Sequence, residues 1–144
     1  MKLQVNIYLA EDDADDQIFF EKVLSELPVS AKLNTFSDGK ELMKFLVSNS
    51  YDDNSKNILF LDLSMPNKTG FECLIEIKEN EKLKDLHVVM ITCSLSKSID
   101  FEQYMISTLT RMGADGFICK PDSFKELKSI VETTITRLVE KNTK

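Results

Sequence analysis

The chain has 144 residues and a formal net charge of −6, with 42% hydrophobic and 29% charged residues. This length accommodates one ordinary domain with its own core, and the composition excludes an intrinsically disordered chain. The acidic balance argues against nucleic acid or an anionic membrane as partner. No apolar stretch reaches the roughly 18 residues of a membrane span, and the N-terminus lacks a signal peptide, so we expect a cytoplasmic protein.

Five short apolar runs, separated by polar segments, predict five β-strands. They are Val5–Ala10, Leu33–Phe36, Ile58–Leu61, Val88–Thr92 and Phe117–Cys119. All but the second are nearly continuous in apolar residues, which is typical of parallel strands covered on both faces.

The segments between these runs carry apolar residues at helical spacing. The first helix should end at Pro28 and the fourth at Gly113, because proline cannot continue a helix and glycine favours its C-terminal cap. The last helix should begin after Pro121, with Asp122 or Ser123 as its N-cap. The apolar stripes are Phe20, Val23, Leu24 and Leu27; Leu42, Phe45 and Leu46; Phe71, Leu74 and Ile75; Phe101, Met105 and Leu109 within Ser96–Met112; and Leu127, Val131, Ile135 and Leu138.

The alternation of strands and helices predicts an α/β fold, with a doubly wound, five-stranded parallel sheet and helices on both faces. In such a sheet, ligands bind beyond the carboxyl ends of the strands. Polar residues follow four of the five predicted strands. They are Glu11, Asp12 and Asp13; Asp62; Thr92 and Cys93; and Lys120 with Pro121. We therefore expect these side chains to form one site.

The chemistry of these residues points to a metal ion and a phosphoryl group. Crowded carboxylates repel one another, and a bound divalent cation relieves that repulsion. Hard oxygen ligands favour Mg²⁺ or Mn²⁺ over zinc. An ammonium and a hydroxyl beside the acids suit a transferring phosphoryl group, whose oxygens need positive charge and hydrogen-bond donors. An aspartate in such a site can itself be the nucleophile and become an aspartyl phosphate.

Four motifs in this order resemble the receiver domain of two-component response regulators, over roughly Gln4 to Val139. They are Glu11-Asp12; LFLDLSMPNKTG with Asp62, Pro66 and Gly70; MITCS with Thr92; and GFICKP with Lys120-Pro121. The resemblance implies a flavodoxin-like sheet of strand order 2-1-3-4-5. Because little chain follows the last predicted helix, we expect a single receiver domain over residues 1–144 without an output domain. The EDDADD segment and the polar loop Tyr51–Asn57 further resemble stand-alone receivers paired with phytochrome-like histidine kinases.

The resemblance also implies roles for the acids. Asp62 would accept a phosphoryl group from the phosphohistidine of a sensor histidine kinase or phosphotransfer protein. Mg²⁺ would be held by Asp12, Asp62 and the backbone carbonyl of Ser64, while Glu11 would act through water. A phosphoacceptor of this kind is a signalling domain and not an enzyme.

Further roles follow for the ends of the last two strands. Thr92 and the ammonium of Lys120 would hold the phosphoryl oxygens. Phe117 stands at the position of the family's switch aromatic, whose rotamer changes as Thr92 moves, and Pro121 would follow Lys120 through a cis bond. The protein, a monomer or weak homodimer, would then dock to an unknown downstream protein or relay the phosphoryl group onward.

Several other residues have simpler interpretations. The three cysteines form an odd number without a CxxC pair, which favours reduced thiols. Cys93 lies among carboxylates that would raise the pKa of a thiol, so we expect it to pack and not to sense redox state. Asp13 adds a third acid to the pair. Asp15 and Asp16 should lie in the first turn of a helix, where negative charge matches the macrodipole and no catalytic role is needed.

The segment Ser94–Met112 is predicted to carry a contact surface. It is about six residues longer than in the chemotaxis receiver and carries more apolar side chains than one buried stripe requires. They are Ile99, Phe101, Tyr104, Met105, Ile106 and Leu109. We expect some of them to be exposed.

Three other functions compete with this interpretation. A phosphatase of the haloacid dehalogenase kind needs a second aspartate two residues after the nucleophile, where this chain has Ser64. A flavodoxin-like electron carrier needs a hydroxyl-rich loop after the first strand, and Glu11, Asp12 and Asp13 would repel a flavin phosphate. A receiver-fold binding module that is never phosphorylated would not need the full set of site residues.

Overall fold

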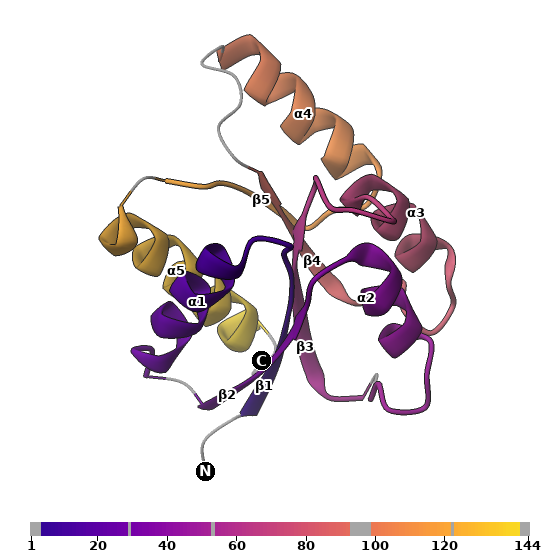
Figure 1. Ribbon diagram of the computed structural model, residues 1–144, viewed down its shortest axis with the longest axis horizontal. Coiled ribbons are helices and arrows are strands. Elements are labelled where there is room, and N and C mark those ends of the chain that lie inside the picture. Colours follow the sequence, from indigo (N-terminus) through magenta and orange to yellow (C-terminus); the bar gives the residue numbers. More distant parts are fainter. Residues whose placement is uncertain (1–3, 29, 53, 93–98, 122, 142–144) are drawn as a thin grey trace.

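The computed structural model describes residues 4–28, 30–52, 54–92, 99–121 and 123–141 (Figure 1). The strands in these ranges are β1 (Gln4–Ala10), β2 (Ser30–Phe36), β3 (Lys56–Asp62), β4 (His87–Thr92) and β5 (Gly116–Cys119). The helices are α1 (Ala14–Ser25), α2 (Gly39–Leu46), α3 (Gly70–Glu79), α4 (Ile99–Arg111) and α5 (Phe124–Lys141). The strands pair in parallel in the order β2-β1-β3-β4-β5. This order confirms the predicted doubly wound, flavodoxin-like sheet.

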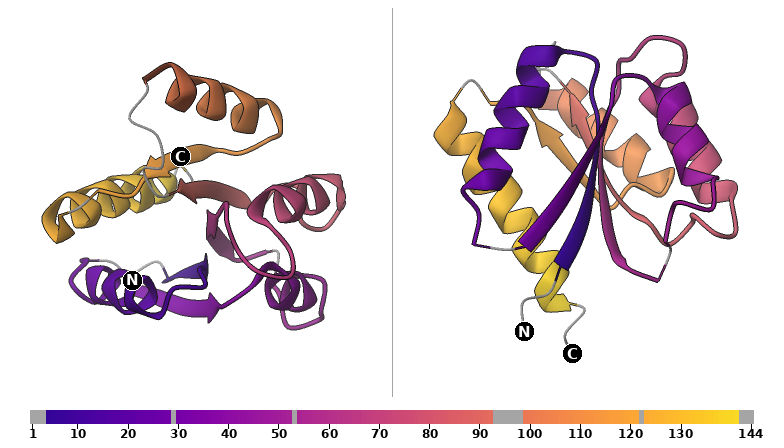
Figure 2. Two further views of the ribbon diagram at one scale, coloured as in Figure 1. Left: turned by 45° about the horizontal axis from the view of Figure 1, so that its top comes forward. Right: turned by 60° about the horizontal axis from the view of Figure 1, so that its bottom comes forward.

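Helices cover both faces of the sheet (Figure 2). α1 and α5 pack on one face, and α2, α3 and α4 pack on the other. Because successive strand residues point to opposite faces, Phe60 joins the core under α1 and α5 while Leu61 joins the other core. Each such buried side chain stabilises the fold by about 1.5–3 kcal/mol. None of the described helices combines the length and apolar character needed to cross a membrane.

Polar side chains fix the starts of several helices. Asp13 is the N-cap of α1 and accepts hydrogen bonds from two backbone N–H groups of the first turn. Thr69 and Glu72 form a reciprocal capping box at the start of α3. The Ser123 hydroxyl accepts from the backbone N–H of Glu126 at 3.3 Å, which supports Ser123 as the cap of α5. Its alternative, Asp122, lies outside the described residues.

The ends of two helices test the sequence-based boundaries. Gly113 has a φ of 105° just after α4, which confirms it as the glycine that ends this helix. The predicted end of α1 at Pro28 is wrong, because the helix already ends at Ser25. A residue before proline avoids the helical conformation, so Leu27 lies in a turn after the helix. Its side chain is still buried in the core.

The buried face of α3 also differs from the predicted stripe. Ile75 was expected in the core and is 47% exposed. The residues that α3 buries are Gly70, Cys73, Leu74 and Ile77. These four follow the i, i+3, i+4, i+7 spacing of a single helix face. Ile75 is rotated by about 100° from Leu74 around the helix axis and so lies off this face.

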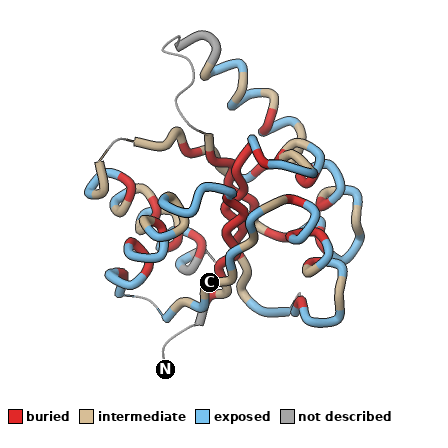
Figure 3. Tube along the Cα trace, in the orientation of Figure 1, coloured by how far each residue is buried: buried red, intermediate tan, exposed pale blue. Residues whose placement is uncertain are grey.

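α4 contacts the core near its C-terminal end (Figure 3). Leu109 is 1% exposed, whereas Tyr104 is 63% and Ile106 is 37% exposed. These two residues confirm that some apolar side chains of the predicted contact surface face solvent. Residues 93–98, and the side chains of Ile99 and Phe101, lie outside the described part of the chain.

Candidate functional site

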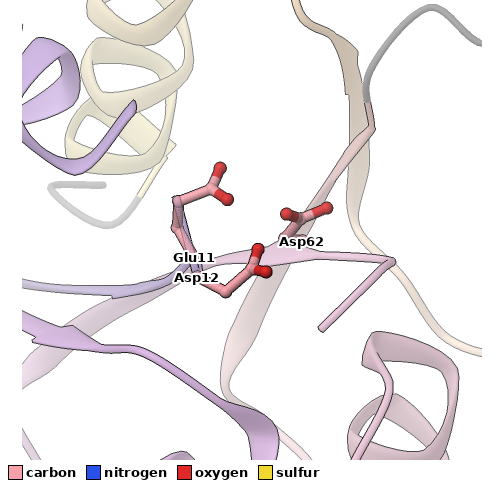
Figure 4. Close-up of side chains that lie close together, drawn as sticks. All are labelled: Glu11, Asp12 and Asp62. Carbon is pink, nitrogen blue, oxygen red and sulfur yellow. The ribbon is translucent and has the colours of Figure 1, made fainter. Parts of the chain in front are cut away.

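The parallel register brings the acids at the ends of β1 and β3 together. Ala10 pairs with Leu61, so Glu11 and Asp12 follow β1 beside the place where Asp62 ends β3. Oxygens of the Glu11, Asp12 and Asp62 carboxyl groups all lie within 4.8 Å of one another (Figure 4). The prediction that these acids gather at the strand ends is confirmed.

Burial makes this acid cluster electrostatically costly. Glu11 and Asp62 are 3% and 5% exposed, whereas Asp12 is open to solvent. Burial, and next a hydrogen bond with Asp62, raise the pKa of Glu11 to about 7, and Lys120 opposes this rise. A cation with oxygen ligands would remove the repulsion. Three carboxyl groups, one of them facing solvent, fit a divalent cation that keeps part of its water shell.

The positively charged side chain of Lys120, the residue after β5, reaches this cluster of acids. Ile118 packs in the core under α1 and α5, and Lys120, two residues on, points to the same side. Its ammonium donates hydrogen bonds to the Glu11 carboxylate and, at 2.8 Å, to Asp16 Oδ2. Burial acts to lower the pKa of Lys120, but the hydrogen bonds with Asp16 and Glu11 raise it, so the side chain stays charged.

Asp16 is the residue of this arrangement that the sequence reasoning missed. The sequence predicts a position in the first turn of α1, which the structure confirms. It gives no reason to pair Asp16 with the residue that follows β5, 104 positions later. The one available indication is that the first turn of α1 directly follows the acids that end β1, so its side chains lie near the same edge of the sheet.

The segment after Asp62 folds back over the end of β3. The backbone N–H of Ser64 donates to Asp62 Oδ1 at 3.2 Å, and the N–H of Gly70 donates to the carbonyl of Leu63 at 3.0 Å. A side chain at position 70 would collide with the backbone carbonyl of Asp62. The motif glycine therefore sets how closely α3 approaches the end of β3.

Thr92 ends β4 beside this site, and Phe117 lies on the neighbouring strand β5. Ile91 is the register partner of Asp62, so Thr92 stands one position beyond it at the end of β4. The Thr92 carbonyl accepts from the backbone N–H of Lys120 at 2.8 Å, which joins the ends of the two strands. Phe117 is half-buried and packs against the core that includes the end of α4.

The peptide bond between Lys120 and Pro121 is trans. No described residue has a cis peptide bond, so the expected cis bond is wrong. The trans form is the default because it is favoured by about 0.5–1 kcal/mol even before proline. Cys93 lies outside the described residues, and its packing role stays a prediction.

A pocket of about 510 Å³ opens beside the acids, between α1 and α5. Its polar side includes Glu11, Asp16 and Lys120, and its apolar side includes Phe20 and Leu127. Lys120 and its two carboxylate partners therefore line this pocket, and of the two carboxylates Asp16 is the one with substantial exposure.

Comparison with known proteins identifies the family to which the chain belongs. Residues 7–132 match the response regulator receiver domain family. Response regulator Rcp1 of Synechocystis sp. is 30% identical over 128 residues, which are 88% of this chain and 83% of Rcp1. Two-component response regulator ARR15 of Arabidopsis thaliana is 32% identical over 128 residues, which are 82% of this chain but 58% of ARR15.

Solved structures agree with the sequence comparisons. The Mn²⁺-bound form of response regulator Rcp1 has a TM-score of 0.71 at 29% identity, with 89% of each chain covered. The phosphorylated cyanobacterial phytochrome response regulator RcpA has a TM-score of 0.71 at 27% identity, with 90% of this chain and 89% of RcpA covered. Receiver domains work with sensor histidine kinases. The chain therefore belongs to the response regulator receiver domain family, and it is a phosphoacceptor signalling module of two-component systems rather than an enzyme.

Proposed function

We propose that Asp62 accepts a phosphoryl group from the phosphohistidine of a sensor histidine kinase. The observation that carries this proposal is the convergence of the Glu11, Asp12 and Asp62 carboxyl groups, with the Lys120 ammonium reaching the same cluster. An Asp62 oxygen would attack the phosphorus, forming a P–O bond as the P–N bond breaks. The imidazole nitrogen would keep the electron pair of the broken bond.

Mg²⁺ is the cation that this site would use. Asp12, Asp62 and the backbone carbonyl of Ser64 would hold it, and Glu11 would act through a bound water molecule. When bound, the ion supplies positive charge that offsets both the acids and the phosphoryl oxygens. The all-oxygen donor set supports this assignment. The similar Rcp1 has been solved with Mn²⁺, a cation of the same ligand preference.

Thr92 and Lys120 would hold the phosphoryl oxygens, and Phe117 would transmit the change. The backbone hydrogen bond between Thr92 and Lys120 supports a coupled movement of these two strand ends. Phe117 packs toward α4, whose Tyr104 and Ile106 are exposed. We therefore expect phosphorylation to alter the surface of α4 and β5 and so change docking to a downstream protein.

The kinase partner is proposed to be of the phytochrome type. Support comes from the likeness to a cyanobacterial phytochrome response regulator at 27% identity. Phosphotransfer from a panel of purified kinases would test this assignment. Fastest transfer from a phytochrome-like kinase is the expected result, and faster transfer from an unrelated kinase would contradict it.

Uptake of one phosphoryl group from acetyl phosphate tests the main proposal. Intact-mass measurement should show a single addition that requires Mg²⁺ and disappears in Asp62→Asn. Asp85→Asn is the control, because Asp85 is an exposed carboxylate outside the site, and this variant should be phosphorylated normally. A phosphorylated Asp62→Asn variant would overturn the assignment. A wild-type protein that takes up nothing would instead be a receiver-fold binding module.

A further inference from the structure

The ammonium of Lys120 lies between two carboxylates, and neither of them is the proposed phosphoacceptor. It donates to Glu11 and to Asp16, at 2.8 Å for Asp16. Lys120 and Asp62 are both described, and no hydrogen bond or ion pair joins them. Lys120 is therefore hydrogen-bonded to Glu11 and to α1, while Asp62 acts on it only through the longer-range attraction of its charge.

Asp16 differs from the other acids near the site. It comes from the first turn of α1, which Asp13 caps, and it is not one of the three carboxylates that converge at the strand ends. Its side chain is 42% exposed, whereas that of Glu11 is 3% exposed. Asp15 shares the same helical turn, yet no hydrogen bond or ion pair links its side chain to Lys120. Proximity to the helix start therefore does not by itself explain the pairing.

We propose that Asp16 is a positioning residue that competes with the phosphoryl group for Lys120. The proposal rests on the phosphoryl chemistry assigned to Asp62. All three N–H donors of an ammonium are on one nitrogen atom, so a turn of the Lys120 side chain toward Asp62 takes them away from Asp16. A partly exposed ion pair is weak and can be exchanged for a doubly charged phosphoryl group. Asp16 thus favours the resting state over the phosphorylated state.

Affinity for beryllofluoride, which occupies the position of the phosphoryl group, measures this competition at equilibrium. The matched variants are Asp16→Ala and Asp15→Ala, which remove the same charge from the same helical turn and install the best helix former. At about 0.5 M NaCl, long-range charge effects are screened within a few ångströms. Calorimetry with saturating Mg²⁺ should show Asp16→Ala binding about two- to five-fold tighter than Asp15→Ala, the range expected for a partly exposed pair.

Two further readouts separate positioning from a structural role. Asp16→Glu keeps a carboxylate that can reach Lys120, so its beryllofluoride affinity should return toward that of the wild type. The phosphoryl group acquired from acetyl phosphate should also persist longer on Asp16→Ala than on Asp15→Ala. Asp16→Asn preserves the side-chain shape and replaces Asp16→Ala if the alanine variant unfolds.

The proposal is overturned if Asp16→Ala binds beryllofluoride no more tightly than Asp15→Ala, or if Asp16→Glu behaves as Asp16→Ala does. Its failure can be distinguished from failure of the proposed function. A wild-type protein that takes up no phosphoryl group at Asp62 would refute both. If the wild-type protein is phosphorylated at Asp62 but Asp16→Ala and Asp15→Ala bind beryllofluoride equally tightly, only the role of Asp16 is refuted.

Discussion

Gly70 packs directly against the backbone of Asp62, the proposed phosphoacceptor. A methyl group at position 70 would lie 2.2 Å from the Asp62 carbonyl oxygen and 2.9 Å from the Cα of Leu63. Both neighbours are backbone atoms and cannot turn aside as a flexible side chain would. The approach of α3 to β3, and with it the position of Asp62, therefore depends on a glycine at this point.

Replacing this glycine should damage both stability and phosphorylation. We expect Gly70→Ala to lower the free energy of unfolding by about 2–3 kcal/mol, because overpacking forces the backbone to shift. Gly116→Ala is the control, since its new methyl group would meet Val89 Cγ2 at 3.5 Å, an ordinary contact. Denaturant unfolding and the rate of labelling by acetyl phosphate measure the two effects. Equal behaviour of the two variants would contradict the argument.

The affinity for Mg²⁺ should depend strongly on Asp12 and only weakly on its neighbour Asp13. Asp12→Ala should abolish measurable Mg²⁺ binding, because its carboxyl group belongs to the converging cluster. Asp13→Ala should retain most of the affinity but lose about 1 kcal/mol of stability, because Asp13 caps α1. Calorimetric titration with Mg²⁺ and denaturant unfolding give the two values. Equal losses of Mg²⁺ affinity would show that the ligands are wrongly assigned.

The two sides of α4 should respond differently to truncation. Leu109→Ala should cost about 2–4 kcal/mol of stability, because Leu109 is 1% exposed. Tyr104→Ala should stay within about 0.5 kcal/mol, because Tyr104 is 63% exposed. If α4 forms the docking surface, Tyr104→Ala should still weaken binding to a downstream partner in a pull-down with the phosphorylated protein. Unchanged binding would remove Tyr104 from that surface.

Cys73 should resist alkylation at neutral pH. Burial raises the pKa of its thiol to about 11, and its Sγ donates to the Gly39 carbonyl at 3.6 Å. Because the thiolate is the reactive form, labelling near pH 8 should be roughly a hundred-fold slower than for an ordinary thiol, and should rise with pH toward 11. Peptide mapping after iodoacetamide treatment measures this rate, with the urea-unfolded protein as control. Equal labelling of folded and unfolded protein would contradict the burial argument.

The sheet and its acid cluster could be predicted because the relevant pattern is local. β1, β3 and β4 lie inside the sheet and are largely buried on both faces, so their apolar runs are nearly continuous and the polar residues after them stand out. β2 is an edge strand with alternating exposure, and its polar start, Ser30 to Lys32, was missed. In parallel strands the carboxyl ends share an edge, so placing Asp12 near Asp62 needed only the strand order.

The contacts of Lys120 and the face of α3 could not be predicted in the same way. The pair Lys120–Asp16 depends on where the first turn of α1 lies relative to the residue that follows β5, which spacing along the chain does not encode. Ile75 is apolar and stands four residues after Phe71, which suggested a shared buried face. The close approach of Gly70 to β3 instead sets the rotation of α3 about its axis. The bond before Pro121 is trans, as peptide bonds before proline generally are, and not cis as the resemblance to the family implied.

Direct location of the phosphoryl group tests the central claim most simply. Borohydride reduces an aspartyl phosphate to homoserine, so peptide sequencing by mass spectrometry identifies the modified position in the wild-type protein. After treatment with acetyl phosphate and Mg²⁺, homoserine should appear at position 62 and nowhere else, and it should be absent when EDTA replaces Mg²⁺. Homoserine at Asp12 or another acid, or none under any condition, would contradict the assignment of Asp62 as the phosphoacceptor.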